Sequence, residues 1–283
     1  MKICRFNANR VGVVQDDVVR DVTDALSGRL DISWPPAPED ALIARLAELR
    51  PIMEAAAATA PSLPVSAVRF LSPVGAPPKI VAAPVNYQKH VEESVADVGI
   101  HHGSMVKDIE TAGLFLKSPT SLIGPSSPVA IRFPDRRNDH EIELAVIIGK
   151  YADRVSRDDA LDYVAGYAIG LDMTVRGPED RSFRKSPDSY TVLGPWMVTA
   201  DEFGDPSGVE LELRVNDEVR QHANTRDLII DVPGLIAFAS TWYSLRPGDV
   251  LITGTPEGVG PVVAGDTIHA QIDRIGRMSV AVQ

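Results

Sequence analysis

Three carboxylates lie where the sequence otherwise predicts buried strands. Glu141 and Glu143 are two residues apart at the start of a predicted strand that continues as Leu-Ala-Val-Ile-Ile. Because side chains alternate between the faces of a strand, both carboxylates are expected on one face. Asp172 lies inside a second apolar stretch, residues 167–173. Neighbouring carboxylates repel each other unless a proton or a cation lies between them. Three oxygen ligands suit a hard octahedral cation, so the pattern predicts a Mg²⁺ site, with Mn²⁺ as a substitute.

Spacing alone leaves a second interpretation of these carboxylates open. They could face water, or they could pair with nearby arginines such as Arg154 and Arg176. An isolated Glu-x-Glu on a strand is more often explained in this way than by a metal. The third carboxylate, inside another apolar strand, favours the cation site.

A histidine and a lysine could complete a catalytic site. His90 and Glu93 are three residues apart, so in a helical turn their side chains share a face and can form a hydrogen bond. A carboxylate that fixes one imidazole tautomer makes the histidine a competent general base toward water. Near a metal, the ammonium of Lys185 could stabilise an enolate or an oxyanion. The simpler interpretations are a surface histidine on a mobile loop and an ordinary surface lysine.

A glycine-rich loop at residues 253–260 could present backbone N–H groups and the Thr255 hydroxyl to a carboxylate. An ordinary glycine-rich turn explains the same composition. The chain has no phosphate-binding G-x-x-x-x-G-K-[ST] loop, no dinucleotide-binding G-x-G-x-x-G fingerprint and no G-x-S-x-G nucleophile elbow. These absences argue against nucleotide-dependent chemistry and serine esterases.

The elements that must position these residues are mostly short strands. Apolar or β-branched stretches predict strands at 114–117, 129–133, 141–149, 167–174, 194–199 and 250–253. Helices are predicted at 38–58, 160–164 and 233–245, and the polar segment 88–110 is predicted to be a mobile lid. This pattern predicts a β-rich α+β fold. We expect a small N-terminal α/β domain over residues 1–72, joined through a proline-rich segment to a catalytic domain over residues 73–283.

Composition narrows the classes of protein. The 283 residues carry a formal net charge of −11, which argues against a nucleic-acid or anionic-membrane partner. No apolar run is long enough to predict a transmembrane helix or a signal peptide. Cys4 is the single cysteine, so no intrachain disulfide is possible and a cytoplasmic location is expected. Nothing near Cys4 in the sequence marks it as an activated nucleophile.

Six motifs, in this order, resemble the fumarylacetoacetate hydrolase superfamily over residues 79–267. They occupy residues 86–93, 114–117, 140–150, 166–176, 185–195 and 248–260. No single motif is decisive, but the six together are specific. The resemblance implies a mixed β-sandwich roll for the large domain, and usually a homodimer.

The resemblance also implies roles for the candidate residues. Glu141, Glu143 and Asp172 match ligands of a Mg²⁺ or Mn²⁺ ion that chelates a small 2-oxo acid. His90 and Glu93 match a lid dyad that generates hydroxide, and Lys185 matches the group that stabilises charge as a C–C bond breaks. Arg176 and Thr255 match substrate contacts. Substrates in the superfamily are acylpyruvates, oxaloacetate-like diacids or hydroxymuconate-type compounds from aromatic breakdown.

Two departures from the family pattern affect the expected reaction. Val175-Arg-Gly-Pro-Glu replaces the common Ala-Arg-Asp-x-Gln, so Glu179 replaces an amide that donates to the oxyanion in hydrolases. A carboxylate cannot donate unless it is protonated. Pro84 replaces a glycine before the lid. The leading hypothesis is metal-dependent hydrolysis of a C–C bond in an acylpyruvate-type β-diketo acid. The alternative is an isomerase, tautomerase or decarboxylase of a keto diacid that uses the same metal site, and Glu179 favours that alternative.

Overall fold

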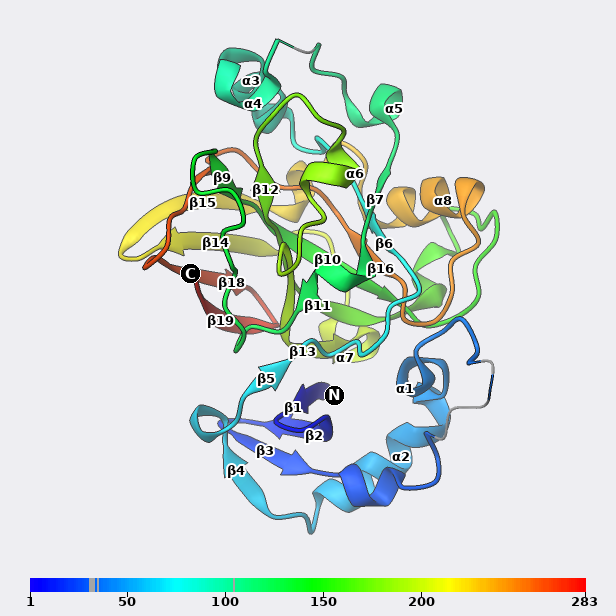
Figure 1. Ribbon diagram of the computed structural model, residues 1–283. Coiled ribbons are helices and arrows are strands. Elements are labelled where there is room, and N and C mark those ends of the chain that lie inside the picture. Colours follow the sequence, from blue (N-terminus) through cyan, green and yellow to red (C-terminus); the bar gives the residue numbers. More distant parts are fainter. Residues whose placement is uncertain (31–33, 35, 104) are drawn as a thin grey trace.

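One large mixed sheet runs through the molecule (Figure 1). The computed structural model describes residues 1–30, 34, 36–103 and 105–283. Within these residues the largest sheet has 12 strands, ordered β4 (Ser62–Pro64), β3 (Val18–Asp21), β2 (Arg10–Gln15), β1 (Lys2–Phe6), β13 (Thr191–Thr199), β11 (Val164–Asp172), β10 (Ile142–Ile148), β16 (Val250–Ile252), β6 (Ile80–Ala82) and β7 (Phe115–Lys117), with β5 (Phe70–Leu71) on β1 and β8 (Leu122–Ile123) on β13. The β6–β16 and β8–β13 pairs are parallel, whereas the central pairs are antiparallel.

Two smaller sheets and a few helices cover the large sheet. One smaller sheet contains β12 (Thr174–Val175), β9 (Asn138–His140) and β17 (Gly260–Pro261). The other contains β15 (Glu218–Asn224), β14 (Glu210–Val215), β18 (Thr267–Ile272) and β19 (Gly276–Ala281). The described α-helices are α1 (Ala41–Ala44), α2 (Leu46–Ala57), α3 (Gln88–Ala96), α4 (Val98–His101), α5 (Ile109–Ala112), α6 (Arg181–Arg184), α7 (Ala200–Phe203) and α8 (Val232–Trp242). The predicted β-rich α+β fold, a mixed β-sandwich roll, is confirmed.

The central strand β10 is buried on both faces, which explains its apolar sequence. Leu144 and Val146 point into a core shared with β14, β18 and α8. Ala145 and Ile147 point into a second core that is shared with α2. Period-two alternation continues toward the start of the strand, so Glu143 lies on the same face as Ala145.

The N-terminal residues form a group of their own, with β1 to β5, α1 and α2 at the bottom of Figure 1. Backbone pairing nevertheless connects this group to the rest, because β1 runs antiparallel to β13. The division at residue 72 stays a prediction.

Two sequence predictions about local structure were wrong. Residues 129–133 form no strand, because their pairing with the C-terminal residues is limited to the isolated bridge between Val129 and Val282 and one hydrogen bond from the Ile131 N–H, and the backbone bends at Arg132. The predicted helix at 160–164 is a single 3₁₀ turn at Ala160–Tyr163, since β11 begins directly after it. The described part of the chain contains no helix long and apolar enough to cross a bilayer.

Cys4 is expected to be unreactive in the folded protein. Its side chain is fully buried on β1, and this burial raises the pKa of the thiol to about 12. At pH 8 the folded protein therefore holds almost no thiolate, whereas an unfolded chain, with a cysteine pKa near 8.5, holds a substantial fraction. A chromogenic disulfide reagent should label no thiol within minutes at pH 8 and one thiol per chain after denaturant is added. Rapid labelling of one thiol in the native protein would contradict this burial.

Candidate metal centre and active site

The antiparallel pairing of β10 with β11 brings the three candidate ligands together. Glu141 lies just before β10 and Asp172 is the last residue of β11, and the Asp172 N–H donates to the Glu141 carbonyl at 2.9 Å. Glu143, two residues further along β10, points to the same face. One carboxylate oxygen from each of the three residues lies within 4.8 Å of the others, and all three side chains are buried. The alternative in which these carboxylates face water is therefore wrong.

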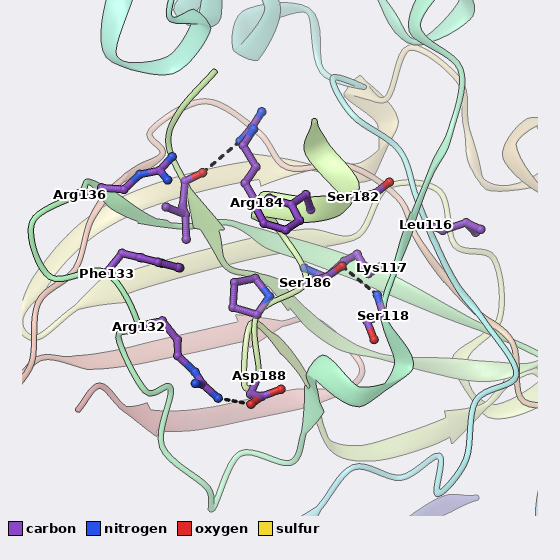
Figure 2. A pocket seen from close by; sticks show the side chains of 13 residues that line it. Leu116, Lys117, Ser118, Arg132, Phe133, Arg136, Ser182, Arg184, Ser186 and Asp188 are labelled. Atoms are coloured by element: carbon purple, nitrogen blue, oxygen red, sulfur yellow. Dashed lines mark hydrogen bonds and ion pairs between the residues drawn. The ribbon is translucent and has the colours of Figure 1, made fainter. Parts of the chain in front are cut away.

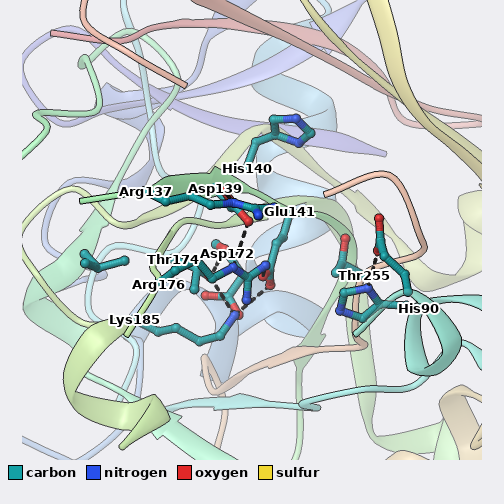
Figure 3. Close-up of polar contacts among 12 residues, drawn as sticks. His90, Arg137, Asp139, His140, Glu141, Asp172, Thr174, Arg176, Lys185 and Thr255 are labelled. Atoms are coloured by element: carbon teal, nitrogen blue, oxygen red, sulfur yellow. Dashed lines mark hydrogen bonds and ion pairs between the residues drawn. The ribbon is translucent and has the colours of Figure 1, made fainter. Parts of the chain in front are cut away.

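Two of the carboxylates are paired with buried cations, as Figure 3 shows. Glu141 accepts from Arg176 at 2.8 Å and from Lys185 at 2.6 Å. Lys185 also donates to Asp172 at 2.7 Å, and Lys117 donates to the other oxygen of Asp172. Burial alone would raise the pKa of Glu141, but the charges of Lys185 and Arg176 hold it below its usual value. The predicted pairing with an arginine is thus correct for Arg176 and Glu141.

Glu143 is different, because among the described residues it has no cationic partner. Its carboxylate accepts only the backbone N–H of Gly254. Burial, together with the negative charges of Asp172 and Glu141, raises the pKa of Glu143 well above its usual value. Gly254 has φ +98°, and a Cβ there would lie 2.7 Å from the Cβ of Asn86, so glycine is required at this contact.

The donor set fits a hard divalent cation. Four buried carboxylates form this cluster, and three of them have cationic partners: Asp139 pairs with Arg137 and Arg176, Glu141 with Arg176 and Lys185, and Asp172 with Lys117 and Lys185. A buried charge is unfavourable unless an opposite charge lies beside it. Glu143 has no such partner among the described residues, and a carboxylate oxygen of Glu141 and one of Asp172 lie close to it. The residues present therefore match the oxygen-rich site that Mg²⁺ or Mn²⁺ takes.

Helix α3, in the segment that the sequence predicts to be a lid, carries the predicted dyad. His90 Nδ1 and Glu93 Oε2 are 2.8 Å apart on α3, which confirms the predicted hydrogen bond. Because a carboxylate only accepts, Nδ1 carries the proton and Nε2 is left free to accept one. The other oxygen of Glu93 accepts from the Gly258 N–H at 2.9 Å, so α3 is anchored to the glycine-rich loop. Gly258 has φ +91°, and a Cβ there would lie 2.0 Å from the Arg220 carbonyl.

Asn86 fixes the point at which the lid leaves the sheet. This fully buried amide donates to the carbonyls of Ile230 and Thr253, both at 2.8 Å, and accepts from the Ile230 N–H at 2.8 Å. It thus connects the start of the lid to the strand end that leads into the glycine-rich loop.

Thr255 is buried behind the carboxylates. Its hydroxyl donates to the Ile142 carbonyl at 3.0 Å and accepts from Gln221 at 2.8 Å. Thr255 therefore fixes the glycine-rich loop against β10, and its contact with a substrate carboxylate stays a prediction.

Glu179 is held in an ion pair. Arg136 donates to both of its oxygens, at 3.0 Å and 2.7 Å. This pairing lowers the pKa of Glu179, so the side chain stays ionised and cannot act as a hydrogen-bond donor.

One cavity of about 330 Å³ joins the dyad to the carboxylates. Its walls include His90, Glu141, Arg176, Glu179 and Lys185. Of the predicted site residues, four line the cavity, namely His90, Glu141, Arg176 and Lys185, and four do not, namely Glu93, Glu143, Asp172 and Thr255. Glu143 and Asp172 each have a carboxylate oxygen within 4.8 Å of one of Glu141, which does line the cavity.

Several site residues escaped the sequence interpretation. Lys117 ends an apolar strand, and a lysine in the pattern Phe-Leu-Lys was a usable signal of a buried charge. Asp139 pairs with Arg176 at 2.7 Å and with Arg137 at 2.7 Å, but no spacing rule connects it to either. Arg181 and Arg184 on α6 also line the cavity and resemble surface residues in the sequence.

The sequence of this chain is similar to those of known metal-dependent and related enzymes of one family. Residues 79–283 match the family model described as fumarylacetoacetate (FAA) hydrolase, C-terminal. The chain belongs to this family. It is 55% identical to a maleylpyruvate hydrolase of Aquipseudomonas alcaligenes over 100% of this chain and 99% of that protein. A mitochondrial oxaloacetate tautomerase of Rattus norvegicus is 33% identical over 78% of this chain and 72% of its own length.

Solved structures of the fumarylacetoacetate hydrolase family extend the similarity to the whole fold. The crystal structure of maleylpyruvate hydrolase from Sphingobium sp. SYK-6, in complex with a manganese(II) ion and pyruvate, is 44% identical to this chain. The alignment has a TM-score of 0.85 and covers 100% of this chain and 98% of the Sphingobium chain.

Proposed function

We propose that this protein is a divalent-metal-dependent hydrolase that cleaves a C–C bond in an acylpyruvate-type β-diketo acid, as part of the breakdown of aromatic compounds. The observation that carries the proposal is one cavity lined both by His90 of the histidine–glutamate dyad and by Glu141 of the cluster of three buried carboxylates. The two maleylpyruvate hydrolases, which align over the full chain, support the same reaction class.

The proposed metal ligands are Glu141, Glu143 and Asp172. A divalent cation bound there would act as a Lewis acid that polarises the oxygens of the 2-oxo acid. Magnesium is the expected physiological ion, with manganese as a substitute. The manganese complex of the Sphingobium protein supports a divalent ion but does not choose between the two.

The chain's own residues supply the remaining steps. His90 Nε2 takes a proton from water, while Glu93 keeps the ring in the required tautomer. The water oxygen adds to the distal acyl carbonyl, and the bond between that carbon and the neighbouring methylene breaks. The electron pair goes to the pyruvate enolate, which then takes up a proton at the methylene carbon. Lys185 stabilises the negative charge on the departing pyruvate, and Arg176 holds Glu141 in place.

Product analysis in ¹⁸O-labelled water tests the proposed reaction. We expect one pyruvate per acylpyruvate consumed, at least one ¹⁸O atom in the carboxylate of the other product, and no CO₂. A chelator should stop the reaction and added Mg²⁺ or Mn²⁺ should restore it. Consumption of the substrate without pyruvate release would exclude hydrolysis.

The second candidate is enolisation or decarboxylation of a keto diacid at the same site. The oxaloacetate tautomerase among the relatives and the ionised Glu179 support it. Such a reaction needs no added water, so it would release CO₂ or isomerise oxaloacetate without incorporation of label. Hydrolysis remains the leading proposal because the full-length relatives at 55% and 44% identity are both hydrolases.

We also propose that two chains form a homodimer through an apolar face beside α6, in line with the family resemblance. Leu116, Phe133 and Phe183 are exposed there, with Phe183 74% exposed, around a cavity of about 630 Å³ (Figure 2). Exposed apolar patches of this kind are typical of interaction surfaces. A cytoplasmic location stays a prediction.

Replacing Phe183 with aspartate is expected to shift the protein from dimer to monomer, because an aromatic ring that the interface would bury is replaced by a charged group that must lose its hydration. Light scattering after size-exclusion chromatography measures the mass directly. The matched control is Trp242→Asp on α8, which is 73% exposed outside this face and should remain dimeric. A monomeric wild-type protein, or a dimeric Phe183→Asp variant, would refute the assignment of this face.

A further inference from the structure

Arg137 connects the helix that carries the dyad to the carboxylate cluster. It lies directly before β9, and its guanidinium binds two carboxylates from different parts of the chain. Its Nε donates to Asp139 at 2.7 Å, and its Nη1 donates to Asp97 at 2.7 Å. Asp139 is fully buried, whereas Asp97 belongs to the segment that carries α3. One side of the guanidinium is therefore fixed in the interior, and the other side reaches the dyad helix.

The inner side belongs to a chain of alternating charges that ends at Glu141 (Figure 3). The second oxygen of Asp139 accepts from Arg176 Nε at 2.7 Å, and Arg176 in turn donates to Glu141 at 2.8 Å. The Arg176 backbone N–H also donates to the Arg137 carbonyl at 2.8 Å. Hydrogen bonds between charged groups of this length are among the stronger ones in proteins. Arg137 is thus held at a fixed place relative to the proposed metal ligand.

The outer side of the guanidinium holds the end of the dyad helix. Asp97 is the residue at which α3 ends and α4 begins, and its backbone N–H donates to the Glu93 carbonyl at 2.9 Å. The hydrogen bond from Arg137 holds the pKa of Asp97 below its usual value, so this carboxylate is charged at neutral pH. Glu93 is also bound by the Gly258 N–H, near the middle of the helix. Asp97 supplies a second attachment, one helical turn after the dyad.

We propose that Arg137 is a positioning residue: through Asp97 it fixes the helix that carries His90 at a set distance from the carboxylate cluster. This inference rests on the proposed hydrolase function, in which His90 must face a substrate bound at the carboxylates. The side chain of His90 pairs with Glu93, so the contacts of α3 with the rest of the protein determine where the base lies. Arginine suits this role because its planar fork carries several donors and can bind two carboxylates at once.

Steady-state kinetics of Asp97→Asn test this role, because asparagine keeps the cap of α4 and removes the charge that Arg137 binds. We expect kcat to fall roughly 10-fold, since a displacement of about 1 Å in a catalytic site can cost more than that. KM should stay close to the wild-type value, because the carboxylate cluster is unchanged. In a His90→Ala background, Asp97→Asn should not lower kcat further, since the base that it positions is already absent.

Arg137→Gln should reproduce the fall in kcat, and its combination with Asp97→Asn should be no slower than either single variant. Hydrogen–deuterium exchange of the metal-free protein gives a second readout that does not depend on activity. The amides of α3 should exchange about fivefold faster in both single variants, the upper value for loss of a partly exposed ion pair.

The matched control is Asp108→Asn, at another helix cap of the same segment. Asp108 accepts the Thr111 N–H at 2.8 Å and forms no ion pair within the described part of the chain. This variant loses a carboxylate charge but no attachment to the sheet, so kcat and the exchange of α3 should be unchanged.

Three contrary outcomes are distinguishable. An unchanged kcat in Asp97→Asn, or an equal fall in kcat with and without His90, would overturn the positioning role. Unchanged exchange of α3 in Asp97→Asn and Arg137→Gln would overturn the attachment itself. A wild-type enzyme that cleaves no acylpyruvate would instead overturn the proposed hydrolase function, and the exchange of α3 would still decide whether Arg137 holds the helix.

Discussion

Replacing Asp172 with alanine is expected to abolish turnover and to lower the free energy of unfolding by about 3–5 kcal/mol, the usual effect of breaking a buried ion pair. The loss of turnover follows from the loss of a metal ligand. The loss of stability follows from Lys117 and Lys185, two buried ammonium groups that both donate to this carboxylate. Steady-state rates with Mg²⁺ and Mn²⁺ measure the first effect. Urea denaturation of the metal-free protein measures the second.

Glu143→Gln is the matched comparison, because Glu143 has no cationic partner among the described residues. Turnover should fall as far as in Asp172→Ala, since a ligand charge is lost. Stability of the metal-free protein should stay the same or rise, since removal of this charge relieves repulsion from Glu141 and Asp172. If Asp172→Ala turned over substrate at the wild-type rate, Asp172 would not be a metal ligand. Equal destabilisation of the two variants would refute the charge distribution described above.

Replacing His90 with alanine is expected to lower kcat by roughly 10² to 10⁴, the usual contribution of a general base. The metal affinity should remain close to that of the wild type, because His90 pairs with Glu93 and not with the carboxylate cluster. Steady-state kinetics gives the first quantity and a Mn²⁺ binding titration gives the second.

The control for His90 is His222→Ala, a change at an exposed histidine on β15 that should leave both quantities unchanged. An unaltered kcat in His90→Ala would exclude His90 as the base. A parallel loss of metal affinity and rate would show instead that His90 supports the metal site.

The sequence predicted much of the fold because its strongest signals are local. The apolar run after Glu143 is a strand buried on both faces, and the break at Pro233 lies in the first turn of α8. One wrong prediction was also local, since residues 129–133 have a strand-like composition but pair only briefly, through Val129 and Ile131, with the C-terminal residues. Propensity indicates that a segment can be extended, but whether a neighbouring strand is available depends on the tertiary structure.

The candidate site was predictable where its residues share a strand or a helical turn. Glu141 and Glu143 follow from period-two spacing, and the His90–Glu93 hydrogen bond follows from helical spacing. Long-range pairing was not predictable from spacing. Lys117 reaches Asp172 from 55 residues away, and the burial of Arg184 depends on how α6 packs beside the cavity. Asp172 was joined to Glu141 and Glu143 because it is a charge inside an apolar strand, whereas the order of the family motifs supplied the role of Lys185.

Equilibrium binding of Mn²⁺, followed by electron paramagnetic resonance, tests the central claim most directly. The account predicts one ion per wild-type chain, competed by Mg²⁺, and an affinity at least roughly 10²-fold weaker in Glu143→Gln, whose metal-free fold should be intact. Mn²⁺ binding of equal affinity and stoichiometry in the two proteins would contradict it, because the three carboxylates would then not be the ligands.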